Sequence, residues 1–278
     1  MMPPSEIKQI LSRWNGRANK ALGQNFLVDP TVLKAILQSA HVQPGEHVLE
    51  VGPGLGVLTR ALLDAGAQVT AIEQDRRFVE FLSGPDAGFA SSRRPEVVHG
   101  DAAVVHWHTI VGDRPWKFVS NLPYSITSLA LRKALWAPRP PEKLVVLVQR
   151  EVAERAIAKD GKTSLLSLMV AFASSSARIV KRVPAGAFYP PPKVESAILE
   201  VIPQTWSDRE VRWGVHPEKI MEWARLGFAH PRKLLASNLG LKTGERAISS
   251  LEEVGLNAKA RAEDLSPEEW AMLARRLS

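Results

Sequence analysis

The feature that most constrains the fold of this chain is a glycine-rich turn, Glu-Val-Gly-Pro-Gly-Leu-Gly, at residues 50–56. It closes an apolar segment at residues 48–51 that is typical of a buried strand, and it opens residues 57–65, which have the pattern of a helix. Glycines let the backbone turn sharply and approach a ligand closely, since a Cβ atom would block the approach. This strand–turn–helix unit therefore predicts a ligand site where the strand ends.

Strands and helices alternate along the first half of the chain. Short apolar segments at residues 68–72, 96–98, 118–120 and 144–148 predict further strands, and helical patterns separate most of them. This alternation predicts an α/β fold with an open, doubly wound parallel sheet. Ligands of such sheets bind at the carboxyl ends of the strands.

The pattern changes after residue 161. One helix is predicted at residues 164–173, two strands follow, and from Trp206 onward only helical patterns occur. We therefore place a domain boundary near Pro203. The expected organisation is an α/β domain at residues 1–203, which includes an N-terminal arm at residues 1–29, and a small all-helical domain at residues 204–278.

Composition narrows the class of protein. A formal charge of +7 favours a polyanionic partner such as a nucleic acid. The absence of cysteine excludes disulfides and cysteine-ligated zinc. His106 and His108 have no third ligand at metal-binding spacing, so we interpret them as part of a surface turn and expect no metal site. Without a signal-peptide profile or a long apolar run, we expect a cytoplasmic protein that does not bind a membrane.

Three acidic residues lie at the carboxyl ends of the first three predicted strands. Glu50 lies two residues before the first glycine of a G-x-G-x-G turn, whereas dinucleotide sites use G-x-G-x-x-G. An acid there would repel a pyrophosphate but suits a ligand with a sulfonium and an ammonium group. Glu73 is placed to accept hydrogen bonds from ribose hydroxyls, and Asp101 to accept one from an adenine amine. Together they predict S-adenosylmethionine as the methyl donor.

The fourth strand leads into Asn121-Leu122-Pro123-Tyr124. An exocyclic adenine amine is a poor nucleophile because its lone pair is delocalised into the ring. The amide oxygen of Asn121 and the carbonyl of Leu122 could accept its two N–H bonds and aim the lone pair at the methyl carbon. Tyr124 could stack on a base that has left its helix. The turn therefore predicts methyl transfer to N6 of adenine.

Six motifs give the chain a family resemblance. They are residues 22–27 (Leu-Gly-Gln-Asn-Phe-Leu), 50–56, Glu73, residues 100–101, residues 121–124, and residues 188–196 (Phe-Tyr-Pro-Pro-Pro-Lys-Val-Glu-Ser). In this order the chain resembles the bacterial small-subunit (16S) rRNA adenine N6,N6-dimethyltransferases. The likeness extends from about residue 20 to residue 240.

The resemblance implies a class I methyltransferase domain with a Rossmann-like sheet and a small helical RNA-binding domain. It implies S-adenosylmethionine as donor and N6,N6-dimethyladenosine as product. The implied target is two adjacent adenosines in the 3′-terminal hairpin of small-subunit rRNA, within an immature 30S-type particle. We expect a monomer.

The resemblance also implies a role for individual residues. The implied donor contacts are Asn25, Leu27, Gly52, Glu73, Asp101 and Asn121. The implied catalytic residues are Asn121, Leu122, Tyr124 and Phe188, the last an aromatic that packs on the other side of the target base. The chain departs from the family at residues 228–233, Phe-Ala-His-Pro-Arg-Lys, where a denser arginine pair is usual. This leaves the details of rRNA contact there open.

Two alternatives stay open from the residues alone. The same chemistry could act on an adenine of large-subunit rRNA, as in antibiotic-resistance methyltransferases, because the active-site motif is shared. The chain could also be an RNA- or DNA-binding protein on a methyltransferase scaffold. The intact motif at residues 121–124 argues against lost activity.

Overall fold

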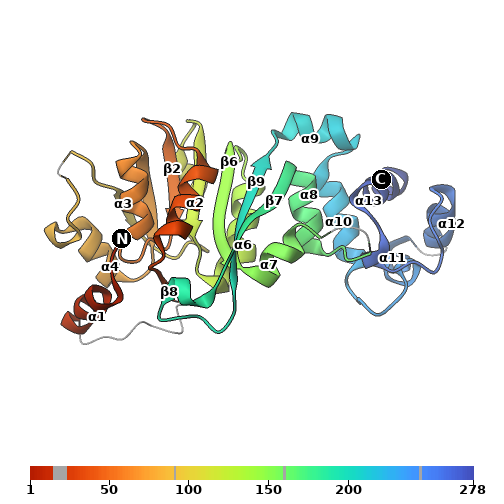
Figure 1. Ribbon diagram of the computed structural model, residues 1–278. Helices are drawn as coiled ribbons and strands as arrows, with labels where there is room; N and C mark the ends of the chain where they lie inside the picture. Colours follow the sequence, from red (N-terminus) through yellow and green to blue (C-terminus); the bar gives the residue numbers. More distant parts are fainter. Residues whose placement is uncertain (15–23, 91, 159–160, 244–245) are drawn as a thin grey trace. The chain divides into compact units, whose positions relative to one another are not determined.

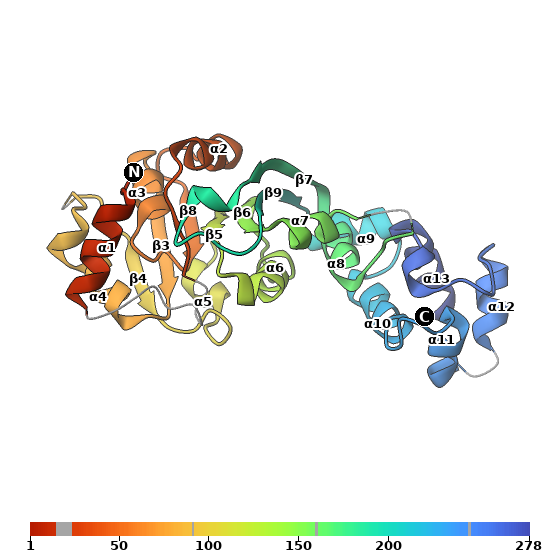
Figure 2. The same ribbon diagram turned by 60° about the horizontal axis from the view of Figure 1, so that its bottom comes forward.

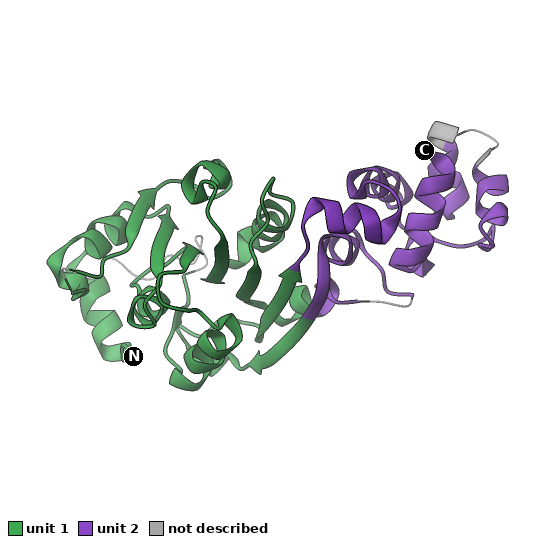
Figure 3. Cartoon of the chain, turned by 90° about the horizontal axis from the view of Figure 1, so that it is seen from above, with its two compact units in different colours: residues 1–153, 178–202 green, residues 154–177, 203–278 purple. Residues whose placement is uncertain are grey.

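The computed structural model describes residues 1–14, 24–90, 92–158, 161–243 and 246–278, so Leu22 and Gly23 of the first motif lie outside the described residues. The chain divides into two compact units, one of Met1–Ala153 with Arg178–Ile202 and one of Glu154–Ala177 with Pro203–Ser278 (Figure 3).

The break after Ile202 lies beside the boundary expected at residue 203, but the segment Glu154–Ala177 groups with the C-terminal helices instead of the α/β unit. Its helix α8 (Leu165–Ala173) is buried at seven of its nine positions, and it packs against the helices of the second unit. A helix that is apolar on all sides needs partners all round, and those partners come later in the chain.

The main sheet has seven strands among the described residues. Their order is β4 (Glu96–His99), β3 (Gln68–Glu73), β2 (His47–Val51), β5 (Trp116–Asn121), β6 (Lys143–Gln149), β9 (Ser196–Pro203) and β7 (Ser174–Val183). The first five are parallel, as the alternation predicted, whereas β9 runs antiparallel to β6. Helices link the parallel strands. The connection from β7 to β9 contains no α-helix, so these two consecutive strands need not be parallel to each other.

The strand order places the ligand crevice. From β2 the sheet continues through β3 and β4 on one side and through β5 and β6 on the other. The order therefore reverses between β2 and β5, and a crevice opens there at the carboxyl ends of the strands. Residues 144–148 of β6 are fully buried, which agrees with a central strand covered on both faces.

Helices cover both faces of this sheet. The helical segments that lie wholly or mainly in the first unit are α1 (Pro4–Arg13), α2 (Pro30–Ala40), α3 (Val57–Asp64), α4 (Arg76–Ser83), η2 (Pro85–Ala87), α5 (Trp107–Val111), η3 (Tyr124–Ile126), α6 (Thr127–Leu135), α7 (Arg150–Ala156) and η4 (Ala185–Ala187). Asp29 caps α2, accepting a hydrogen bond from the Thr31 N–H at 2.7 Å. Helix α2 lies on one side of the sheet, and α5 and α6 lie on the other (Figure 2).

The described residues of the N-terminal arm form a helix and a short strand. Its residues 4–13 form helix α1, which lies beside α4 (Figures 1 and 2). Just past its end, the Trp14 ring meets the Phe78 and Phe81 rings edge-on, at centroid distances of 5.6 and 5.8 Å. Further along the arm, β1 (Phe26–Leu27) pairs antiparallel with β8 (Phe188–Tyr189). The arm is thus part of the first unit.

The second unit is helical apart from the first four residues of β7. Besides α8 it contains α9 (Trp206–Trp213), α10 (Pro217–Gly227), α11 (Leu235–Thr243), α12 (Arg246–Glu253), η5 (Ala262–Asp264) and α13 (Pro267–Leu277). Trp213, Trp223 and Trp270 are buried, as expected for residues that fill its core. Trp206 is only half-buried and stacks on His216. No helix in the described part of the chain is long and apolar enough to cross a membrane.

Candidate active site

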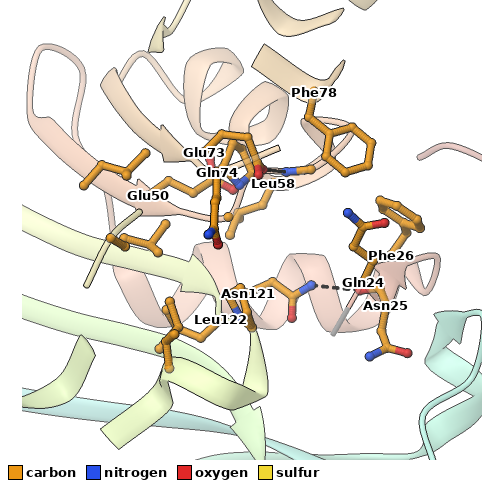
Figure 4. Close-up of a pocket in the computed structure, with 18 of the residues that line it drawn as sticks. Gln24, Asn25, Phe26, Glu50, Leu58, Glu73, Gln74, Phe78, Asn121 and Leu122 are labelled. Carbon is orange, nitrogen blue, oxygen red and sulfur yellow. Dashed lines mark hydrogen bonds between the residues drawn. The ribbon is translucent and has the colours of Figure 1, made fainter. Parts of the chain in front are cut away.

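A pocket opens at the carboxyl ends of β2, β3, β4 and β5 (Figure 4). It encloses about 1070 Å³ of space between protein atoms, including solvent at its mouth, which is ample for a nucleoside-sized ligand. Its lining includes Asn25, Leu27, Gly52, Glu73, Asp101, Asn121, Leu122 and Tyr124. The structure therefore brings all the predicted donor contacts and all but one of the predicted catalytic residues to a single cavity.

The glycine turn lets β2 end against the turn that follows β5. Gly52 has φ +71°, and a Cβ atom at this position would lie 2.9 Å from Cγ of Pro123. Gly54 has φ +55°, where a Cβ atom would lie 3.2 Å from the Phe26 ring. Both positions thus require glycine for backbone conformation and for space. The close approach sets the two turns side by side in the lining of the pocket.

Glu50 is a buried acid in the wall of this pocket. Its side chain is 1 % exposed, and the Thr59 hydroxyl donates a hydrogen bond to its Oε2 at 2.7 Å. Burial raises the pKa of Glu50 to about 8, so the free protein holds this carboxyl protonated at neutral pH. A cation bound beside it would favour the ionised form. Glu50 is therefore neutral in the free protein and would become ionised when a cationic ligand binds beside it.

Glu73 ends β3 with both carboxylate oxygens facing backbone donors. The Gly54 N–H donates to one oxygen at 3.1 Å, and the Asp75 N–H donates to the other at 2.8 Å. Burial raises the pKa of Glu73, while these backbone hydrogen bonds oppose that rise. They fix the orientation of the carboxylate, and each oxygen keeps a lone pair for a ligand hydroxyl.

Asp101 is the second residue after β4. The Ala103 N–H donates to its Oδ1 at 2.8 Å, and Oδ2 accepts no hydrogen bond from any residue the structure describes. The N–H of the preceding Gly100 donates to the carbonyl of Glu73 at 2.9 Å, which ties the two acidic turns together. One oxygen of Asp101 is therefore held by its own turn, and the other is free to accept from a ligand.

Asn121 is oriented by the N-terminal segment. Its Nδ2 donates to the backbone carbonyl of Asn25 at 3.3 Å, drawn as a dashed line in Figure 4. Within the described ranges, Asn121 Oδ1 accepts no hydrogen bond. Because the donor end of the amide is engaged, its acceptor end is available in the pocket. The family resemblance implied that Asn25 contacts the donor, but it gave no sign that the Asn25 carbonyl would anchor Asn121.

Tyr124 is tied to the last motif of the chain. Its hydroxyl and the Ser196 Oγ form a hydrogen bond of 2.7 Å, and burial raises the pKa of this phenol. Ser196 is itself buried at the start of β9. The half-buried ring thus has a fixed position in the pocket wall. Neither the sequence pattern nor the resemblance pointed to Ser196 as its partner.

Phe188 is the predicted site residue that does not line the pocket. It is 3 % exposed and lies in β8, opposite Leu27 of β1. The predicted surface turn at residues 106–108 is wrong in part, because Trp107 begins helix α5 and is buried against Phe118. The described part of the chain contains no group of three histidine, aspartate or glutamate side chains that could hold a metal.

Comparison with known proteins decides the family. The model of the family described as ribosomal RNA adenine dimethylase matches residues 15–278. The chain belongs to the ribosomal RNA adenine dimethylase family. The predicted fold class, the enzyme class and the use of S-adenosylmethionine are confirmed for this dimethylase.

Relatives of this dimethylase match along nearly their whole length. The ribosomal RNA small subunit methyltransferase A of Dehalococcoides mccartyi is 41 % identical, covering 97 % of this chain and 91 % of the relative. The enzyme of the same name from Novosphingobium aromaticivorans is 38 % identical, covering 100 % and 98 %.

Two solved structures are also similar. The 23S rRNA methyltransferase ErmE is 31 % identical with a TM-score of 0.65, covering 91 % of this chain and 99 % of that chain. A dimethyladenosine transferase from Plasmodium falciparum shares the fold, with a TM-score of 0.72 at 24 % identity, covering 89 % and 95 %.

Proposed function

We propose that this dimethylase methylates two adjacent adenosines in the 3′-terminal hairpin of small-subunit rRNA, within an immature 30S-type particle, giving N6,N6-dimethyladenosine. One observation carries the chemistry. The Asn121 amide has its nitrogen engaged by the Asn25 carbonyl and its oxygen open in a pocket that also contains three acids suited to the donor.

Each of the three acids binds a different group of the donor. Glu50 lies where a sulfonium or ammonium group would stabilise its ionised form, and Glu73 offers two fixed oxygens to the ribose hydroxyls. Asp101 offers Oδ2 to the adenine amine. Asn25, Leu27 and Gly52 would complete the walls of the donor site.

Asn121 and Leu122 act on the acceptor amine. The Asn121 Oδ1 and the Leu122 carbonyl accept the two N–H bonds, which draws the amine nitrogen towards tetrahedral geometry. Its lone pair then forms the new C–N bond as the S–C bond breaks, sulfur keeps the bonding electrons, and the amine proton leaves to solvent. Holding amine and methyl in line supplies most of the acceleration. No side chain of shifted pKa is needed as a base.

The target base has to leave its helix to reach the pocket. Tyr124, held by Ser196, would stack on one face of it. Phe188 remains the candidate for the other face, and a base there requires this buried ring to become exposed. The monomethyl product keeps one N–H, which one of the two acceptors could still hold, so the second transfer needs only room in the pocket for the first methyl group.

The helical residues 204–278 are proposed to contact rRNA. Arg225, Arg232, Lys233 and Lys259 are exposed in this part, and the chain as a whole carries +7. The preference for small-subunit RNA rests on relatives of that name at 38 % and 41 % identity over nearly the full chain, against 31 % for ErmE. We propose that the enzyme works in the cytoplasm as a monomer.

The test compares three RNA substrates. The protein is incubated with a labelled methyl donor and either immature small subunits, naked small-subunit rRNA or naked large-subunit rRNA, and modified adenosines are mapped by mass spectrometry. The proposal requires dimethyladenosine at two adjacent positions of the small-subunit hairpin. Methylation confined to large-subunit rRNA would replace it with the ErmE-like activity, and RNA binding without transfer would favour the scaffold alternative. Asn121→Ala protein gives the background.

A further inference from the structure

Lys133, on the last turn of α6, makes three hydrogen bonds to one stretch of backbone. Its Nζ donates to the carbonyl oxygens of Ala102, Ala103 and Val105 at 2.8, 2.7 and 2.8 Å. An ammonium group has three donors, so this stretch uses all of them. A lysine at a protein surface normally leaves its ammonium group in water. The ammonium group of Lys133 instead binds the backbone of a turn.

The turn that Lys133 orders is the one that carries Asp101. Ala102 lines the pocket beside Asp101, and its carbonyl also accepts a hydrogen bond from the Trp107 indole at 3.0 Å. The turn closes tightly, because a Cβ atom on Gly100 would lie 2.6 Å from Cγ2 of Val105. Three carbonyls that point at one ammonium group leave this turn little freedom to move.

Helix α6 joins this turn to the methyl-acceptor side of the pocket. It begins at Thr127, directly after the 3₁₀ segment η3 that contains Tyr124. Lys133 is therefore anchored in the same rigid element that follows Asn121 to Tyr124. A single side chain links the backbone of the proposed adenine-binding turn to the helix behind the catalytic turn.

We infer that Lys133 is a positioning residue for the donor, which holds residues 100–105 so that Asp101 Oδ2 meets the adenine amine. This inference rests on the proposed donor role of Asp101. It predicts that loss of the Lys133 ammonium impairs recognition of that amine in particular, rather than binding of the whole donor.

The experiment measures discrimination between two ligands by calorimetry. S-Adenosylhomocysteine carries the amine, and S-inosylhomocysteine has an oxygen in its place. The native enzyme should prefer the first by about tenfold or more, the ratio that one hydrogen bond to a charged group supplies. Lys133→Met should bring this ratio close to one, as should Asp101→Ala.

Lys117→Met is the matched control. Lys117 is also an engaged lysine, whose Nζ donates to the His41 carbonyl at 2.9 Å and to Glu46 at 2.6 Å, but it lies at the opposite end of β5 from the pocket. This variant should lose thermal stability and keep the native ratio. A Lys133→Met protein that binds both ligands more weakly by the same factor would overturn the inference, since its lysine would then be merely structural.

The two proposals fail in different ways. If Asp101→Ala keeps the native ratio, the assignment of the adenine site is wrong. If Asp101→Ala loses the ratio and Lys133→Met keeps it, only the role of Lys133 is wrong. Should Lys133→Met not fold, Lys133→Arg decides, because a planar guanidinium cannot direct three N–H groups at carbonyls arranged around one point. A reduced ratio in that variant supports the inference, and a native ratio refutes it.

Discussion

Replacement of Glu50 by glutamine removes an ionisable group from the pocket wall while keeping its shape and an acceptor for the Thr59 hydroxyl. In the folded protein the pKa of Glu50 is about 8, against an ordinary value of 4.5. The unfolded chain therefore releases this proton at a lower pH than the folded one does. The contribution of Glu50 to stability is greatest below pH 4.5 and is lost as the pH rises towards 8.

These two pKa values set the size of the effect. Relative to its value well below pH 4.5, the free energy of unfolding should fall, through the titration of Glu50, by about 1 kcal/mol at pH 5, about 3 kcal/mol at pH 7 and about 4 kcal/mol at pH 8. Because Glu50→Gln has no such cost, the free energy of unfolding of the variant should exceed that of the native protein by an amount that grows with pH. Other groups titrate in both proteins, so the effect of Glu50 is the difference between the two plots of unfolding free energy against pH.

Urea unfolding of both proteins between pH 5 and pH 8.5 measures this difference. A second readout is donor affinity, which should strengthen with pH in the native enzyme, where the cation favours the ionised acid, and stay flat in Glu50→Gln. If the two unfolding curves run parallel across this range, Glu50 titrates alike in the folded and unfolded chains, and the reasoning from its burial is refuted.

Three further tests address the geometry of the pocket. Asn121→Ala should lower turnover by about 10²-fold or more with little change in donor affinity, because it removes alignment of the amine; near-native turnover would exclude the proposed role. Gly52→Ala and its control Gly45→Ala both place alanine at a positive φ, at a cost of about 1–2 kcal/mol, but only Gly52 faces a neighbour within 4 Å, so only its variant should also lose donor binding in a titration. Ser196→Ala and Tyr124→Phe should each destabilise the fold by about 1–2 kcal/mol in urea unfolding, and the double variant should cost less than the sum unless the hydroxyls act independently.

Much of the donor site could be predicted because its residues follow a local rule. Glu50, Glu73 and Asp101 each lie at the end of a strand, and parallel strands bring such ends to one edge of a sheet. The sequence therefore located the acids without any knowledge of their contacts. Helix α1 was within reach of the same reasoning, since Ile7, Ile10 and Leu11 have helical spacing and are all buried.

The residues that hold the site in place could not be predicted in this way. The Asn25 carbonyl meets Asn121 across 96 positions of the chain, and the carbonyls around Lys133 lie 28 to 31 positions before it. Backbone carbonyls carry no sequence signal, because every residue has one. The burial of Phe188 depends on pairing with a strand of two residues, which is too short to leave a periodic pattern.

The grouping of α8 with the C-terminal helices affects how this enzyme can be dissected. The chain leaves the first unit after Ala153 and re-enters it at Arg178, so each unit is built from two separate stretches of sequence. A protein ending at residue 203 would retain the buried Leu168 and Phe172 of α8 but lose the helices that cover them. Such a fragment should aggregate, and a chimera that exchanges the helical part between relatives needs three junctions, after residues 153, 177 and 202, rather than one. During synthesis, the ribosome must likewise move well past residue 203 before this apolar helix can be shielded.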